Sequence, residues 1–324
     1  MAARDSILVT GGAGFVGSHF AVAAHAAGSR VVILDDLSAG ARPTLPPGIE
    51  LVVGDIGDRE LVHRIVREHG VTAVAHFAGL IQVGESVREP AKYFERNVVR
   101  SLALLDALRG HVGTFLFSST AAVYGMPLAT PIPETAPRAP INPYGSTKLA
   151  IELALEAYGG AYGLRWGALR YFNAAGAQPD GSLRENHEPE THLIPLVIDA
   201  ALGRRPPLTI FGTDYPTPDG TCVRDYIHVV DLAAAHLAAL DVLDREPSLG
   251  AINLGTARGY SVREVVETAS RVLGREVPCS LGVRRPGDPA VLVASTERAA
   301  EVLGWRAQRS DLATIVEDAA RSRR

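Results

Sequence analysis

Six short apolar runs, separated by helix-like or loop segments, most constrain how this chain can fold. The runs are Ile7–Thr10, Arg30–Leu34, Leu51–Val53, Val71–Phe77, Thr114–Ser118 and Leu164–Phe172. Strands that read as continuous apolar runs are typical of a parallel sheet covered on both faces, and the helices between them supply the crossover connections. The pattern therefore predicts an α/β fold built on a doubly wound, Rossmann-like parallel sheet.

The composition narrows the classes of partner that the chain can have. It contains 47% hydrophobic and 21% charged residues, which is ordinary for a globular protein. A formal net charge of −4 gives no reason to expect nucleic acid or an anionic membrane as a partner. No apolar run approaches the roughly 18 residues of a membrane span, and the start of the chain is charged too soon for a signal peptide. A cytoplasmic protein is expected.

The cysteine content is low. Cys222 and Cys279 are too few for a disulfide framework and lack the spacing of metal ligands. The sequence therefore predicts two buried or partly buried free thiols and no metal.

A glycine-rich turn follows the first apolar run. It contains Gly12-x-Gly14-x-x-Gly17 and, in an overlapping register, Gly11-x-x-Gly14-x-x-Gly17. Glycine at these points permits a tight turn, close approach of the backbone to a pyrophosphate and close packing of helix on strand, while the helix N-terminus faces the phosphate charge. Asp35 ends the second run, where a carboxylate accepts from a ribose hydroxyl and repels a 2′-phosphate. The predicted cofactor is NAD rather than NADP.

A second motif joins a tyrosine to a rare lysine. Lysine occurs only at Lys92 and Lys148, whereas the other 30 of the 32 basic residues are arginine. Tyr144 and Lys148 are four residues apart at a predicted helix start, so both side chains lie on one face. A phenol, with a pKa of about 10, needs a nearby positive charge to act as a base at neutral pH. The compact ammonium of Lys148 can supply this positive charge. Thr120, at the end of the fifth run, offers a hydroxyl to a substrate oxygen.

With the glycine-rich turn upstream, the set of Thr120, Tyr144 and Lys148 resembles the short-chain dehydrogenase/reductase superfamily. Longer motifs make the resemblance closer, and the chain is similar to the UDP-glucose 4-epimerases from about residue 5 to about residue 305. These motifs are Thr10-Gly-Gly-Ala-Gly-Phe-Val-Gly-Ser-His19, His76-Phe-Ala-Gly79 with Val83-Gly-Glu-Ser86, Ala122-Val-Tyr-Gly125, Arg170-Tyr-Phe-Asn173 and Asp219-Gly-Thr-Cys-Val-Arg-Asp-Tyr-Ile-His-Val229. The last motif is the longest and the most specific.

The resemblance implies roles for individual residues. Tyr144 would take the proton of the 4-hydroxyl, Thr120 would hold the same oxygen, and Lys148 would hold the nicotinamide ribose and lower the pKa of Tyr144. The implied cofactor-binding residues are Gly11, Gly14, Phe15, Val16, Gly17, Asp35, Asp36, Leu37, Ser38, Ala39, Gly40, Asp55, Ile56, Phe77, Ala78, Gly79, Asn97, Tyr144, Lys148 and Phe172. The implied substrate-binding residues are Thr120, Tyr144, Asn173, Leu193, Ile210, Phe211, Arg224, Arg285 and Asp288, the arginines being suited to a diphosphate.

The alternation of strand and helix patterns stops after Asn173. Residues 174–190 and 205–222 are rich in Pro, Gly, Asp and Thr, which predicts irregular loops. A late strand at Ala251–Leu254 and a helix over Ser261–Leu273, ended by Gly274, follow. The expected organisation is an NAD-binding Rossmann domain over residues 1–172 and a smaller substrate-binding lobe over residues 173–324, with some segments returning to the first domain.

The implied activity is the interconversion of UDP-galactose and UDP-glucose, in which C4 is oxidised, the 4-keto sugar turns over and C4 is reduced again. A 4,6-dehydratase would carry an Asp-Glu pair where this chain has Ala121 and Ala122. A UDP-N-acetylglucosamine or UDP-glucuronate 4-epimerase remains an alternative. A non-catalytic NAD-binding regulator is a further alternative, against which the intact Thr120, Tyr144 and Lys148 argue.

Three positions depart from the pattern of the family. Ile81 stands where some relatives have lysine, Arg96 where many have a second asparagine, and Leu292 where some have tyrosine. Relatives pair through two helices that match residues 92–109 and 144–162, so a homodimer is expected.

Overall fold

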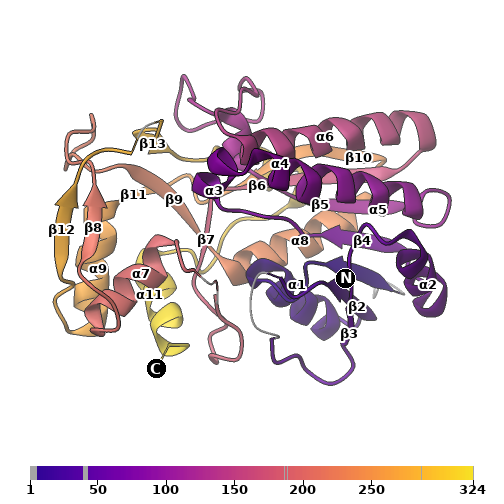
Figure 1. The fold of residues 1–324 in the computed structure, drawn as a ribbon, viewed down its shortest axis with the longest axis horizontal. Helices are drawn as coiled ribbons and strands as arrows, with labels where there is room; N and C mark the ends of the chain where they lie inside the picture. The colour runs from indigo at the N-terminus through magenta and orange to yellow at the C-terminus, as the bar shows by residue number, and fades with distance from the viewer. Residues whose placement is uncertain (1–5, 39–42, 186, 188, 286, 324) are drawn as a thin grey trace.

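A seven-stranded parallel sheet with helices on both faces forms the centre of the molecule (Figure 1). A computed structural model describes residues 6–38, 43–185, 187, 189–285 and 287–323. The strand order is β10-β6-β5-β4-β1-β2-β3, and every neighbouring pair is parallel. The strands are β1 (Ile7–Thr10), β2 (Val31–Asp35), β3 (Glu50–Val53), β4 (Ala73–His76), β5 (Thr114–Thr120), β6 (Arg165–Tyr171) and β10 (Ser248–Leu254). The predicted doubly wound fold is confirmed, and the late strand lies at the sheet edge.

Alternate residues of the central strands face two different apolar layers. The helices around the sheet are α1 (Phe15–Ala26), α2 (Arg59–His69), α3 (Val83–Arg88), α4 (Pro90–Tyr93), α5 (Arg100–Leu108), α6 (Pro143–Tyr162), α8 (Val229–Leu243) and α10 (Glu297–Leu303). Ile7 and Val9 of β1 pack in a core with α1, α8 and α10. Leu8, between them, packs on the other face with α2, α5 and α6. Burial on both faces is the reason why these strands read as continuous apolar runs.

A smaller lobe lies beside this sheet and follows it in the chain (Figure 1). Its elements are β7 (Asn173–Ala175), α7 (Leu193–Ala201), β8 (Leu208–Phe211), β9 (Val223–His228), β11 (Gly259–Ser261), α9 (Val262–Leu273), β12 (Cys279–Gly282), β13 (Val291–Leu292) and α11 (Leu312–Arg321). Strand β9 pairs with β7, β11 and β13, whereas β8 and β12 form a separate two-stranded sheet. Helix α9 begins at the predicted Ser261, which forms a capping box with Glu264, and ends at Gly274. α8 and β10 return to the central sheet.

The helix expected over residues 92–109 is divided into three parts. Between α4 and α5, residues Phe94–Val99 form a π-helical turn (η1). This wider turn carries Asn97, which is buried and bonds to the loop after β4. A π-helical turn inserts one residue into the ladder, often at a functional site, and the apolar period of the sequence gives no sign of it.

One of the two cysteines differs from the prediction. Both thiols are free, and Cys222 is buried, but Cys279 is exposed. Cys279 lies on β12, which pairs with β8 in a two-stranded sheet, and most of β12 faces solvent. Among the described residues, no helix combines the length and the apolar character that a membrane span requires.

The packing of α1 against the preceding turn should not tolerate a side chain at Gly17. A Cβ at this position would lie 2.3 Å from the carbonyl oxygen of Gly11, which is backbone and has little freedom to move. We expect Gly17→Ala to lower the free energy of unfolding by roughly 1–3 kcal/mol, as overpacking does. Urea denaturation measures this change.

Gly160→Ala is the matched control. Gly160 lies in α6, and an added Cβ there meets nothing within 4 Å. Alanine in a helix is favoured over glycine by roughly 0.5–1 kcal/mol, so this variant should be at least as stable as the parent. An unchanged free energy of unfolding in Gly17→Ala would show that α1 can move away from the Gly11 carbonyl at little cost.

Candidate active site

The predicted site residues gather at one edge of the central sheet. All seven strands are parallel, so their carboxyl ends meet at the same edge. The glycine-rich turn follows β1, Asp35 ends β2, and Thr120 ends β5. Ligands in open α/β sheets bind outside these carboxyl ends, and this edge is therefore the candidate site.

The turn after β1 is shaped for close approach by a ligand. Gly11 has a φ of +69°, and a Cβ there would lie 2.4 Å from the backbone nitrogen of Ala78. Gly14 precedes α1 without a side-chain cap, and the first turn of α1 contains no acidic residue. The free N–H groups of α1 can therefore face an anion such as a pyrophosphate.

Asp35 lies directly beside this turn. Its Oδ2 accepts from the backbone N–H of Ala13 at 2.9 Å, and its Oδ1 accepts from that of Leu37 at 2.8 Å. Burial raises the pKa of Asp35, and these two hydrogen bonds partly offset the effect of burial. The carboxylate is thus held rigidly next to the pyrophosphate position, where a ribose hydroxyl would lie.

The other predicted cofactor contacts surround the same edge. Asp36, Leu37 and Ser38 follow β2, Asp55 and Ile56 follow β3, Phe77, Ala78 and Gly79 follow β4, and Phe172 follows β6. Phe15 and Ile56 are buried, and Val16 packs against the core below α1. Ala39 and Gly40 lie outside the described residues.

Arg96, one of the three departures, joins several of these residues. Its Nη2 donates to Asp36 Oδ2 at 2.5 Å and to Ser38 Oγ at 2.9 Å. Its Nη1 lies 3.8 Å from Asp55 Oδ2. The arginine therefore ties together the loops after β2 and β3, a role that the sequence did not indicate.

Lys148 is almost completely buried, with 3% of its surface exposed. Its Nζ donates to the carbonyl oxygen of Ser118 at 3.0 Å and lies 4.9 Å from the centre of the Phe117 ring. Burial lowers the pKa of Lys148 to about 8, because the ammonium loses its hydration.

Tyr144 and Thr120 lie together at the start of α6. Burial raises the pKa of the Tyr144 phenol, and a hydrogen bond with the side chain of Thr120 lowers it in part. Lys148 Nζ lies 6.0 Å from the centre of the Tyr144 ring. The expected depression of the Tyr144 pKa by Lys148 is therefore not produced by the chain alone, because desolvation outweighs the hydrogen bond with Thr120 and raises the pKa.

Asn97 connects the loop after β4 to the helix that carries Tyr144 and Lys148. Its Oδ1 accepts from the N–H of Leu80 at 2.7 Å, and its Nδ2 donates to Leu80 O at 3.0 Å and to Thr147 Oγ1 at 3.1 Å. A Cβ at Gly79 would lie 3.1 Å from Asn97 Oδ1 and 3.7 Å from Lys148 Nζ. The predicted residues Gly79, Asn97 and Lys148 are thus brought together.

A buried ion pair behind Lys148 was missed by the sequence reasoning. Glu152 accepts from Arg170 through Oε1 to Nε at 2.9 Å and through Oε2 to Nη2 at 2.5 Å. Ser119 Oγ also donates to Glu152 Oε1 at 2.5 Å, and Arg170 Nη1 donates to the Tyr124 hydroxyl at 2.9 Å. The signal was present, because Glu152 follows Lys148 by four residues and Arg170 interrupts an apolar strand.

The predicted substrate residues of the second lobe include charged, aromatic and amide side chains. Arg224 is ion-paired with Asp288 through Nη2 and Oδ1, and the Arg285 guanidinium lies 4.3 Å from the centre of the Phe211 ring. Asn173 Nδ2 donates to the carbonyl oxygen of Asp225 at 3.0 Å. Guanidinium groups suit a diphosphate, and the exposed Phe211 ring beside Arg285 suits a flat base.

Two further predicted substrate residues face the core of this lobe. Ile210 is buried, and Leu193, the first residue of α7, packs against the same core. Their side chains are largely used for packing, so each would meet a ligand mainly through its backbone.

A family profile, curated relatives and solved structures all match this chain over most of its length. The profile of the NAD dependent epimerase/dehydratase family matches residues 7–255. A UDP-glucose 4-epimerase of Azospirillum brasilense is 53% identical over 98% of this chain and 92% of the relative. The crystal structure of UDP-glucose 4-epimerase from Brucella ovis with NAD has a TM-score of 0.95 and 48% identity, and covers 98% of each chain. The enzyme from Bifidobacterium longum with NAD⁺ and UDP has a TM-score of 0.91 and 36% identity, again over 98% of each chain.

The buried lysine predicts a specific dependence of stability on pH. Because the pKa of Lys148 falls to about 8 on folding, the unfolded chain holds this proton more tightly. The unfolded state therefore binds more protons between pH 8 and about 10.4, so the free energy of unfolding should rise with pH there. The expected rise is about 2 kcal/mol between pH 8 and 10.

Urea denaturation of the nucleotide-free chain and of Lys148→Met at both pH values measures this effect. Other groups titrate alike in the two proteins, so the variant should lack the rise that is due to Lys148. An identical pH dependence in both proteins would contradict the buried, desolvated ammonium.

Proposed function

The chain belongs to the NAD dependent epimerase/dehydratase family, and we propose that it interconverts UDP-glucose and UDP-galactose at C4 of the hexose. The observation that carries this proposal is the meeting of Thr120, Tyr144 and Lys148 beside the glycine-rich turn. The identity to UDP-glucose 4-epimerases over nearly the whole chain supports it.

The residues at the sheet edge fit NAD. The uncapped N-terminus of α1 suits the pyrophosphate, and Gly11 leaves space that a Cβ would fill. Asp35 suits a ribose hydroxyl and repels a 2′-phosphate. Lys148, one side of which faces Gly79, can donate to the nicotinamide ribose. When bound, the cofactor supplies the chemistry of hydride acceptance and return.

The proton transfers are assigned to residues of the chain. Tyr144 takes the proton of the 4-hydroxyl as C4 is oxidised, and it returns the proton when C4 is reduced. Thr120 donates to the same sugar oxygen and orients it toward the phenol. Because burial raises the pKa of Tyr144 in the chain alone, its anion requires the positive charges of Lys148 and of the oxidised nicotinamide ring.

The second lobe holds the UDP part of the substrate. Arg224 and Arg285 bind the diphosphate, and the ion pair of Arg224 with Asp288 holds that guanidinium in place beforehand. Phe211 offers its ring as one wall. With the binding energy placed on UDP, the 4-keto hexose can turn over between oxidation and reduction and present its opposite face.

Leu292 is assigned to the wall of the hexose pocket. Leu292 packs against a small apolar cluster made of Ala121, Val123, Tyr124 and Ile132. Three of these residues belong to the 3₁₀ turn η2 (Ala121–Tyr124). Thr120, the proposed hydroxyl donor, is the N-cap of this turn. A larger side chain at position 292 would therefore change the space next to the sugar.

A second copy of this chain is the proposed partner. Two neighbouring helical segments expose apolar side chains, with Val99 and Leu102 on one and Leu153 and Tyr162 on α6. Pairing of these faces across a two-fold axis would cover them. The proposed compartment is the cytoplasm, where the free thiols Cys222 and Cys279 would stay reduced.

The role of Tyr144 is tested by removing its hydroxyl alone. We expect Tyr144→Phe to bind NAD and to fold normally while losing roughly 10²- to 10⁴-fold in kcat, the usual contribution of a general base. The assay follows UDP-glucose formed from UDP-galactose.

Tyr162→Phe, the same change at an exposed position of the same helix, should keep full activity. Thr120→Val should cost less than Tyr144→Phe, because it removes an orienting hydroxyl and leaves the base. A near-parental rate in Tyr144→Phe would refute the assignment.

The role of Leu292 predicts a graded preference among substrates. Part of an acetamido group pressed against a packed wall costs about 1–3 kcal/mol, so UDP-N-acetyl sugars should react, but more slowly than UDP-glucose and UDP-galactose. Leu292→Tyr should abolish the weaker activity and spare the main one. Comparison of kcat/KM for both sugar pairs measures this, and equal loss of both would mean that Leu292 only packs.

A further inference from the structure

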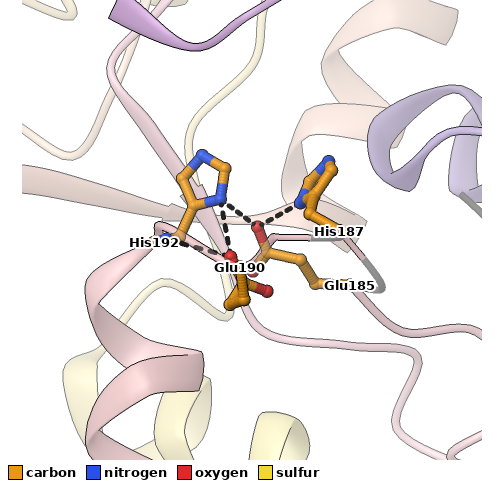
Figure 2. Close-up of side chains that lie close together, drawn as sticks. All are labelled: Glu185, His187, Glu190 and His192. Carbon is orange, nitrogen blue, oxygen red and sulfur yellow. Dashed lines mark hydrogen bonds and ion pairs between the residues drawn. The ribbon is translucent and has the colours of Figure 1, made fainter. Parts of the chain in front are cut away.

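Four side chains that no part of the proposed reaction uses converge between β7 and α7. Figure 2 shows Glu185, His187, Glu190 and His192 directed toward one another. One ligand atom from each lies within 4.8 Å of the others. Glu185 Oε1 is 2.7 Å from His192 Nδ1 and 3.2 Å from His187 Nδ1, and Glu190 Oε1 is 3.1 Å from His192 Nδ1.

The charge of this cluster favours a cation. Only 4% of the Glu185 side chain is exposed, and burial of a carboxylate is costly unless a positive charge or hydrogen bonds compensate it. Glu185 and Glu190 together carry two negative charges, and a proton on His192, which lies between the two carboxylates, offsets only one of them. Arg323, whose Nη2 is 3.4 Å from Glu190 Oε2, shares its own charge with Asp199 at 2.7 Å. A divalent cation would balance the cluster.

Three of the six donor-atom separations are already close to those of a tetrahedral site. Zinc bonds of about 2.0–2.1 Å to nitrogen and oxygen place adjacent ligand atoms about 3.3 Å apart. Three separations in the cluster are 2.7, 3.1 and 3.2 Å. The wider separations, up to 4.8 Å, would need to shorten by small side-chain rotations.

We propose that Glu185, His187, Glu190 and His192 bind one divalent transition-metal ion, with Zn²⁺ as the preferred metal. Each imidazole would bind through Nδ1 and each glutamate through Oε1, and two nitrogen with two oxygen donors suit zinc better than calcium or magnesium. The metal would replace the proton that His192 holds between the two carboxylates, and this proton would pass to solvent, while each bound imidazole would keep one proton on Nε2. The prediction of no metal considered only the cysteines, whereas these ligands form a Glu-x-His-x-x-Glu-x-His pattern.

A metal at this site would restrain the start of helix α7. His192 immediately precedes α7 and forms no side-chain capping bond. Leu193, the next residue, begins the helix and was predicted to contact the substrate. An ion bound here would hold the described residues of the segment 185–192 against the start of α7.

The test is a zinc titration of the untagged full chain after removal of metals with a chelator. Calorimetry, or competition with a chromogenic indicator, should give one Zn²⁺ per chain. His187→Ala/His192→Ala should weaken binding by at least about 100-fold, since even residues behind the ligands affect metal affinity by 10- to 100-fold. Glu185→Gln keeps the shape of the side chain and should also weaken binding, and circular dichroism checks that each variant folds.

His63→Ala/His111→Ala is the matched control. These two rings are also close, at 5.6 Å compared with 5.0 Å for His187 and His192, but among the described residues they belong to no such cluster. The control should bind zinc like the parent. Absence of stoichiometric binding in the parent, or unchanged binding in His187→Ala/His192→Ala, would overturn the proposal. Because the readout is metal binding, the result is independent of the epimerase assay.

Discussion

The buried ion pair between Glu152 and Arg170 is the interaction on which the geometry of the proposed active site depends. Each side chain is 2% exposed, and the pair is bidentate. It joins α6 to β6, and the bond from Ser119 to Glu152 joins α6 to β5 as well. Glu152 lies four residues after Lys148 on one face of α6. Removal of one partner from such a pair costs about 3–5 kcal/mol, because a buried charge is left alone.

The parallel sheet then decides where the remaining groups lie. Because all its strands run in one direction, the glycine-rich turn, Asp35 and Thr120 leave the sheet at the same edge. The second lobe is joined to this edge through β7, which follows β6 after a single residue. Helix α8 and strand β10 return from that lobe to the sheet. The chain connectivity therefore places the proposed substrate-binding lobe next to the sheet edge that carries the proposed cofactor site.

Desolvation explains both perturbed groups at the centre of this site. It lowers the pKa of Lys148 to about 8 and raises the pKa of Tyr144. Both shifts disfavour the charged forms, but a pKa of about 8 still leaves Lys148 mostly protonated at neutral pH. A positively charged ring in this space would favour the phenolate strongly, because its field is poorly screened there. The proposed roles of Tyr144 and Lys148 therefore fit a site that also binds a positively charged nicotinamide ring.

Local patterns in the sequence were sufficient for the doubly wound sheet, the glycine-rich turn, Asp35 and the pairing of Tyr144 with Lys148, because each depends on spacing within one strand or one helical turn. Three features depended on residues far apart in the chain: the linking role of Arg96, the π-helical turn that positions Asn97, and the exposure of Cys279. The direction of the Tyr144 pKa shift also required the tertiary structure, since the loss of water around the phenol depends on how the surrounding elements pack. Sequence periodicity reports which face of an element is covered, whereas distances between elements and the loss of water are set only when the elements pack together.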